Sequence, residues 1–466
     1  MTLRQKLQTF FTTYRLEVLV FILAFAVRFL YLELSIAHYG GDLFGAISGA
    51  DGYFTVAKNI IAGHGFTDSS SAPYLPYSFR PPLYFYFIVG SYWLFHGFLG
   101  SILLQMVIGS MLPVLGMILA SYVLTSRRMI AAVGILLALE PSGILYSTFF
   151  YSEIVFIFLS FLSFWCLFRY FARKQLWPLL ASAGLLGLAC LTRPAVEYLP
   201  VFIAACMVWD ARKHLSKKVY LSVIAYLLMF VAVITPWLCR NEVVFGVADL
   251  SPQLGVNLYT VLLPSVLSVE HGTSWQHEYD TITSNGVQGP NDADITKGKP
   301  YTRLAVPLLL EHKKGLVIIG VNTGVSFFTS DGVLDFLRHI GASTSLRFGK
   351  PALFVLFSSP ATLVSVIAQV ALTPSIFVLF GRIFWVVTTI LFFIGSWWYL
   401  RREQTTRYAS IMVVVVLYSA LTTLIAGLGI TARYRLPVQA FMFVFALYAL
   451  AVLYDRVRRK KQRHHA

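Results

Sequence analysis

The sequence predicts an all-α, polytopic membrane protein, and three observations carry this prediction. Of the 466 residues, 57% are hydrophobic and only 12% are charged, which is too apolar for a soluble globular domain. Apolar runs of about 20 residues, the length that a helix needs to cross a bilayer, recur along the chain. Lys and Arg collect in short clusters between these runs and in the C-terminal sequence RVRRKKQRHHA.

These basic clusters account for the formal net charge of +16. A large positive charge is also found in nucleic-acid-binding proteins, but here the cations follow the positive-inside pattern of membrane proteins. We therefore expect membrane lipids, and no nucleic acid, among the partners. The four cysteines lie in or at the ends of apolar runs and have no CxxC spacing, so we interpret them as small core residues.

Parity orients the spans, because each crossing moves the chain to the other side of the membrane. With both termini in the cytoplasm, ten spans place every basic cluster on the cytoplasmic side. The first apolar run is longer than a signal-peptide core, so we expect it to be an uncleaved span. The ten spans are expected near residues 16–37, 101–124, 129–149, 153–171, 177–192, 195–210, 218–238, 374–400, 408–429 and 436–455.

Three further apolar stretches do not fit this parity. Residues 81–95 would place Arg127 and Arg128 outside if they crossed, so we expect a helix in the outer interface there. Residues 315–328 and 352–372 are compatible with interfacial helices or with an extra hairpin. The sequence thus predicts a single transmembrane domain over residues 1–466, with a first outer loop at 38–100 and a long outer region at 240–373.

This topology gathers charged side chains on the outer face. Asp51 lies in the first outer loop, within GADGYFTVAKNIIAGHGF, and Glu153 begins a long apolar run. Arginine is depleted in short outer loops, yet four arginines are expected there, namely Arg193, Arg240, Arg433 and Arg435. Arginine binds phosphate oxygens through a planar set of donors and stays charged at low dielectric. The pattern therefore indicates an anionic ligand.

Each of these residues also has a purely structural interpretation. Asp51 and Glu153 each precede or begin a predicted helix, where an acid stabilises the N-terminus. Arginines near span ends commonly extend to the interface. Asp51 is a better candidate base than Asp42 or Asp68 in the same loop, because it begins an amphipathic surface helix and can face inward. Arg80 precedes two prolines, which favour extended backbone and hold it at the outer face.

Other chemistry is weakly supported. His271, His277, Glu278 and Asp280 in the long outer region lack a recognised metal-ligand spacing, so we interpret this segment as a solvated loop and leave a divalent metal open. Neither a GxxxxGK[ST] loop nor a GxGxxG motif is present to bind a nucleotide sugar. We expect any donor substrate to reach the site through the membrane.

The motifs, in their order along the chain, resemble those of the GT-C integral-membrane glycosyltransferases. The resemblance rests on GADGYFTVAKNIIAGHGF, SFRPPLYFYFIVGSYWLFHG, the YSE helix start, LTRPAVEYLP, PWLCRNEVVFG and ARYRLPVQAFMFVFALYAL. It is nearest to the group of protein O-mannosyltransferases and lipid A aminoarabinose transferases. Each motif is loose by itself, and their order makes the match specific.

The resemblance implies a GT-C fold and transfer of one sugar, with inversion, from a polyprenyl-phosphate donor. The reaction would occur at the periplasmic face of a bacterial inner membrane, and the acceptor would be a glycan, lipid or protein hydroxyl. Asp51 matches the general base of the family. Many relatives have Asp-Glu at this point, whereas this chain has Asp51-Gly52. The base is kept, and an acid that the family uses in some members to orient the acceptor or a metal is missing.

The resemblance also suggests roles for the remaining candidates. Glu153 matches the second outer acid, which would orient the acceptor or a basic partner. Arg193 and Arg435, with Arg433 beside the latter, match residues that bind the donor phosphate. Three more residues are expected to contact substrate, namely Tyr53, Arg80 and Arg240.

Two other classes of function remain open from the sequence. A transporter or flippase for a lipid-linked anion would line its pathway with acids and arginines, but the sequence has no internal repeat and its polar residues gather on one face. A lipid-linked oligosaccharide polymerase or ligase would also use a polyprenyl donor. Such enzymes generally carry their essential arginines in a large late outer loop, whereas here the acid is in the early loop.

Overall fold

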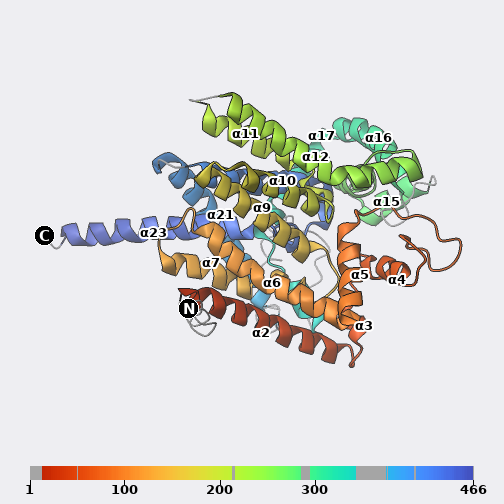
Figure 1. Cartoon of the computed structure of the whole chain (residues 1–466), viewed down its shortest axis with the longest axis horizontal. Coiled ribbons are helices and arrows are strands. Elements are labelled where there is room, and N and C mark those ends of the chain that lie inside the picture. The colour runs from red at the N-terminus through yellow and green to blue at the C-terminus, as the bar shows by residue number, and fades with distance from the viewer. Residues whose placement is uncertain are drawn as a thin grey trace.

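The computed structural model describes residues 13–49, 51–212, 216–284, 294–342, 374, 376–403 and 406–464. Every regular element within these ranges is a helix, as Figure 1 shows. In the described part of the chain, seven helices are long and apolar enough to cross a membrane. They are α2 (Arg15–His38), α6 (Phe98–Ala120), α9 (Glu153–Arg173), α12 (Lys217–Phe245), α21 (Ile376–Arg402), the segment Arg407–Gly429, which joins α22 (Arg407–Thr422) to η4 (Thr423–Gly429), and the part Gln439–Arg459 of α23 (Gln439–His464). The predicted all-α, polytopic fold class is confirmed.

Three predicted spans correspond to shorter helices. These are α7 (Arg127–Leu139), α10 (Leu176–Cys190) and α11 (Leu199–Ala211), which have 13, 15 and 13 residues. A helix of 13 residues rises only about 20 Å, less than the thickness of the bilayer core. The predicted span 129–149 is broken at Glu140, whose carboxylate accepts a hydrogen bond from the Gly143 N–H (2.6 Å) and caps α8 (Pro141–Leu145).

The helices of the first outer region lie at one end of the bundle. In Figure 1, α3 (Leu43–Ile47), α4 (Tyr53–Ile61) and α5 (Leu83–Phe95) are at the end opposite the start of α2 and the end of α23. The stretch 81–95, for which we expect an interfacial helix, forms α5. Its buried aromatic side chains pack with those of α4 and with Phe150 in a separate hydrophobic cluster.

The long outer region consists mainly of short helices, and Figure 1 places α15 and α16 at the same end as α4 and α5. Its elements are α13 (Gln253–Asn257), the π-helix η2 (Leu258–Leu262), α14 (Leu263–His271), α15 (Trp275–Thr283), η3 (Ile295–Lys297) and α16 (Gly298–Glu311). The predicted stretch 315–328 lies in α17 (Lys313–Thr329), which is followed by α18 (Val333–His339) after a bend of 67°. The stretch 352–372 lies outside the described residues.

Among the long helices, α9 is the most enclosed. Within its most apolar window, 72% of the residues are buried, compared with 17% for α12 and 22% for α21, which therefore present most of their surface to lipid. The bundle is built around α9, and Glu153 is its first residue. The fold thus places a carboxylate at the end of the central helix, on the side of α4 and α5.

The topology can be tested with reporter fusions after His96 and after Arg128. We expect the fusion after His96 to report the outer side and the fusion after Arg128 the cytoplasmic side, because α6 lies between them and Arg127 and Arg128 form a basic cluster. A phosphatase reporter, active only outside, and a fluorescent reporter, active only inside, measure this. Identical behaviour of the two fusions would show that α6 does not cross.

Candidate active site

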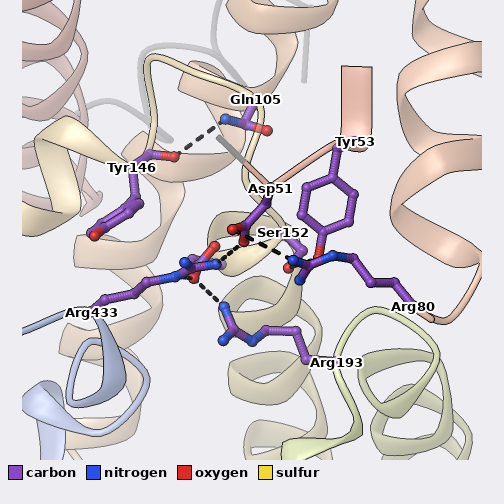
Figure 2. A network of polar contacts seen from close by, with 9 residues as sticks. Asp51, Tyr53, Arg80, Gln105, Tyr146, Ser152, Arg193 and Arg433 are labelled. Carbon is purple, nitrogen blue, oxygen red and sulfur yellow. Dashed lines mark hydrogen bonds and ion pairs between the residues drawn. The ribbon is translucent and has the colours of Figure 1, made fainter. Parts of the chain in front are cut away.

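Three arginines and two carboxylates form a continuous chain of ion pairs at the end of the bundle where α4 and α5 lie (Figure 2). The Asp51 carboxylate receives Arg433 Nη2 at 2.5 Å on Oδ2, and Arg80 Nη2 lies 3.5 Å from its Oδ1. Arg433 also donates through Nε to Glu153 Oε1, and Arg193 donates to the same oxygen. Arg433 therefore joins the two carboxylates. Five of the residues predicted from the sequence meet in one cluster, which we call the arginine–carboxylate cluster (Asp51, Arg80, Glu153, Arg193 and Arg433).

Glycines beside Asp51 allow its loop to approach the start of α9. Gly49 has φ +66°, and a Cβ added there would lie 2.7 Å from the ring of Tyr151 and 2.9 Å from the Phe150 carbonyl oxygen. Gly52, with φ +74°, precedes α4. The Phe150 N–H donates to the Ile47 carbonyl oxygen (2.8 Å), which fastens the two segments together. Larger residues at position 49 would push Asp51 away from Glu153.

The position of Arg80 follows from the two prolines after it and from the aromatic residues around it. The N–H of Leu83, the first residue of α5, donates to the Leu191 carbonyl oxygen (2.9 Å), so the start of α5 lies against the turn that carries Arg193. The Arg80 guanidinium lies 5.0 Å from the centre of the Tyr53 ring. The Tyr53 hydroxyl donates a hydrogen bond to Ser152 Oγ (3.0 Å). Tyr53, a predicted substrate contact, therefore supports Arg80 and the residue before Glu153.

Arg433 belongs to the short helix η5 (Ala432–Tyr434), directly before α23. Its guanidinium lies 4.4 Å from the centre of the Tyr151 ring, close enough for a cation–π interaction. The chain thus brings the first outer loop, the start of α9 and the turn before α23 together at one guanidinium.

The charges of the cluster determine its protonation. Burial by itself would raise the pKa of Asp51, but the nearby Arg433 and Arg80 charges outweigh it and hold this pKa below its usual value. Burial would lower the pKa of Arg433, yet the charges of Glu153 and Asp51 raise it well above its usual value. Near neutral pH the Asp51 carboxylate is therefore ionised and Arg433 is positively charged. Three guanidinium groups against two carboxylates leave the cluster with a net charge of +1.

The structure does not bring Arg435 and Arg240 to this cluster. Arg435 is fully buried, donates to the carbonyl oxygens of Phe327 (2.8 Å) and Ser330, and stacks on Trp385. Arg435 therefore binds the C-terminal end of α17. In this position it does not make the contact with a donor phosphate that we predict from the sequence. Arg240 donates to Asn241 Oδ1 (2.8 Å) and lies over the Trp237 ring. Within the described residues neither forms an ion pair with Asp51 or Glu153.

Sequence reasoning missed Gln105, which supports the segment before Glu153. This residue of α6 is fully buried, and its amide donates to the carbonyl oxygens of Tyr146, Ser147 and Phe149 at 2.9–3.3 Å, the first of which is drawn in Figure 2. The Tyr84 hydroxyl of α5 donates to its Oε1 (2.5 Å). A lone amide within the apolar run SILLQMVIGS is the signal that could have identified it, since buried polar groups require partners.

A cavity of about 340 Å³ opens beside the cluster. Glu153, Arg193 and Arg433 line its charged end, and the rest is bounded by α9, the turn after α10, α22 and the segment before α23. Most of its wall is apolar, with side chains such as Phe156, Phe164 and Val415. Glu197 also lines the cavity, so two arginines and two carboxyl groups face it. The arginines can bind phosphate oxygens, and the apolar wall suits a lipid chain.

Among the residues that the structure describes, no group of three or more His, Cys, Asp or Glu side chains is arranged to hold a metal ion. His271 of the outer region, one of the residues considered above, is instead paired with Glu278 (3.0 Å).

Removal of the shared arginine tests whether it holds the cluster together. We expect Arg433→Met to lower the free energy of unfolding by about 2–4 kcal/mol, because both carboxylates lose a buried partner. Adding Asp51→Asn to this variant should restore part of the loss by removing an unneutralised charge. Thermal unfolding in detergent measures both, with the exposed Arg128→Met as the control. Equal melting temperatures for wild type and Arg433→Met would contradict a structural role.

Replacement of Gln105 tests the support beneath Glu153. We expect Gln105→Leu to cost about 1–3 kcal/mol, because buried carbonyl groups lose their donors. The matched control is Ser110→Ala, a buried residue of the same helix that donates only within α6, to the Met106 carbonyl (2.7 Å). Thermal unfolding compares the two variants, and equal stabilities would show that the contacts of Gln105 are dispensable.

One family model and two solved structures are similar to parts of this chain. The family model "Dolichyl-phosphate-mannose-protein mannosyltransferase" matches residues 79–237. The crystal structure of ArnT from Cupriavidus metallidurans bound to undecaprenyl phosphate has a TM-score of 0.39 and 14% identity, over 93% of this chain and 77% of that chain. The apo structure of the same protein has a TM-score of 0.36 and 13% identity, over 90% and 76%. No curated protein sequence matches the chain.

The matched segment contains Arg80, Glu153 and Arg193 and ends at the Trp237 that lies beneath Arg240. Over this segment the family match confirms the resemblance predicted from the motifs.

Proposed function

We propose that the protein transfers a single sugar, with inversion, from a polyprenyl-phosphate donor to an acceptor hydroxyl. The carrying observation is the arginine–carboxylate cluster, which opens onto a cavity with apolar walls. The cluster lies at the end of the bundle that the positive-inside pattern assigns to the outer side. In a bacterium this is the periplasmic face of the inner membrane, with both termini in the cytoplasm and residues 38–100 and 240–373 forming the outer regions.

The net charge of the cluster suits a phosphate-linked donor. A polyprenyl-phosphate sugar is a phosphodiester with one negative charge near neutral pH, which matches the net charge of +1 on the cluster. Arg193 and Arg433, at the charged end of the cavity, are the proposed phosphate ligands, and the apolar wall accommodates the first part of the prenyl chain. When the sugar leaves, the phosphate gains negative charge, which the arginines stabilise.

Asp51 is the proposed general base. In this mechanism the acceptor oxygen bonds to the anomeric carbon while the bond from that carbon to the phosphate oxygen breaks. The hydroxyl proton passes to the Asp51 carboxylate, and the polyprenyl phosphate leaves. A single displacement of this kind inverts the anomeric centre. Glu153 serves mainly to hold Arg193 and Arg433 in place.

The resting contacts of Asp51 make it a weak base, since Arg433 and Arg80 hold its pKa low. A donor phosphate bound by Arg193 and Arg433 competes with Asp51 for the Arg433 guanidinium. Its binding would draw positive charge away from Asp51 and raise the pKa of that carboxyl, so the base would gain strength only when donor is present. Donor binding and base activation are coupled in this mechanism.

The transfer assay tests the proposal with a panel of donors. The full chain is reconstituted in liposomes with undecaprenyl-phosphate sugars or undecaprenyl-diphosphate sugars, and with a glycolipid extract of a bacterial cell envelope as acceptor. We expect transfer from monophosphate donors, and a fall of about 1,000-fold in rate for Asp51→Asn, because the base is lost. The matched control is Asp42→Asn, an exposed residue of the same loop that caps α3.

Undiminished transfer by a folded Asp51→Asn variant would contradict the general-base role, and transfer only from diphosphate donors would contradict the donor assignment. The transporter alternative predicts a different outcome in the same liposomes. A transporter would move the undecaprenyl-linked sugar donor from one leaflet to the other, and no new glycosidic bond would form.

A further inference from the structure

A second cavity lies far from the arginine–carboxylate cluster, at the other end of the central helix. It has a volume of about 520 Å³ and lies between the C-terminal ends of α9, α11 and α21 and the first turns of α22. Its wall is largely apolar, with Phe171, Phe202, Trp209, Leu400 and Ile411 among the lining side chains. This size is within the usual range for small-molecule sites, about 300–1,000 Å³.

Two arginines line this cavity, and most of their N–H donors make no hydrogen bond among the described residues. Arg212, at the end of α11, donates to the Trp209 carbonyl oxygen (2.8 Å) and stacks on the Trp209 ring. Arg407, the first residue of α22, has a long contact of 3.5 Å to the Phe171 carbonyl oxygen. Each guanidinium has five N–H donors. Within the described ranges neither arginine forms a salt bridge, so most of their donors are available to a ligand.

The local charge is positive. Asp210 also lines the cavity, but it forms no salt bridge with either arginine among the described residues. Lys174 lies close by, and its pKa is lowered by burial and by the charge of Arg407, with Asp210 partly opposing the shift. Two arginines and one lysine against one aspartate leave an excess of positive charge beside an apolar space.

The cavity lies at the level where lipid headgroups are expected. The ends of the membrane-spanning helices α9, α21 and α22 meet here. Trp209 is 67% exposed and pairs with Arg212, and Trp beside a cation is typical of the membrane interface. The positive-inside pattern assigns this end of the bundle to the cytoplasmic side. Basic pockets between transmembrane helices on that side bind anionic lipid headgroups.

We propose that this cavity binds an anionic phospholipid. The lipid phosphate accepts hydrogen bonds from Arg212 and Arg407, and an acyl chain occupies the space between α9, α11 and α22. The occupant is a component of the surrounding leaflet and not the sugar donor, because the cavity is at the end of the bundle opposite the arginine–carboxylate cluster. The site is independent of the proposed transfer reaction.

Native mass spectrometry tests this proposal on the full chain. The protein is equilibrated in nanodiscs of equal phosphatidylglycerol and phosphatidylethanolamine, and the lipids retained after release into mild detergent are counted. Wild type should retain phosphatidylglycerol in preference to phosphatidylethanolamine. We expect the double variant Arg212→Gln, Arg407→Gln to bind phosphatidylglycerol about tenfold more weakly, because two cations near the lipid phosphate are lost.

A matched control removes the same charge elsewhere on this side of the protein. Arg458→Gln with Arg459→Gln alters two exposed residues of α23, outside the cavity, and should leave retention unchanged. Ser410→Phe fills the cavity without changing its charge and should reduce retention of either lipid. Equal retention of the two lipids by wild type, or equal phosphatidylglycerol retention by wild type and the Arg212→Gln, Arg407→Gln variant, would overturn the proposal.

Discussion

One end of the helical bundle depends on a single guanidinium that two carboxylates share. Arg433 donates to Asp51 of the first outer loop and to Glu153 at the start of the central helix α9. The buried Glu153 and the partly buried Asp51 would repel each other without the cation that both contact. Arg80 forms a further ion pair with Asp51, and Arg193 forms one with Glu153. The outer loop, α9, the turn after α10 and the turn before α23 therefore have a common electrostatic centre.

The same arrangement limits the chemistry that the resting protein can perform. A carboxylate held by two arginines is ionised but weakly basic, as the lowered pKa of Asp51 reflects. An anionic donor that competes for Arg433 would relieve this restraint at the moment when a base is needed. In the absence of donor, the positive charge of Arg433 stabilises the two carboxylates. When the donor binds, the same charge stabilises the donor phosphate.

The spans and most of the cluster could be predicted from the sequence. The length of an apolar run indicates a membrane span, and the position of basic clusters indicates its orientation. The sequence predicts Asp51, Glu153, Arg193 and Arg433 on one face, and in the structure they form one cluster. The role of Arg435 could not be predicted. It lies two residues from Arg433 on one short turn, and only the position of the α17 carbonyls, fixed by tertiary packing, decides which arginine faces the cluster. The end of α7 at Glu140 was also not predicted, since hydropathy continues across this break.

The most direct measurement of the central claim is a cryo-EM structure of the full chain with undecaprenyl phosphate. We expect its phosphate oxygens to lie within hydrogen-bond distance of Arg433 and Arg193, and the distance from Arg433 Nη2 to Asp51 Oδ2 to increase beyond its present 2.5 Å. A phosphate bound elsewhere, with the contacts among Asp51, Arg433 and Glu153 unchanged, would contradict the coupling of donor binding to release of the base.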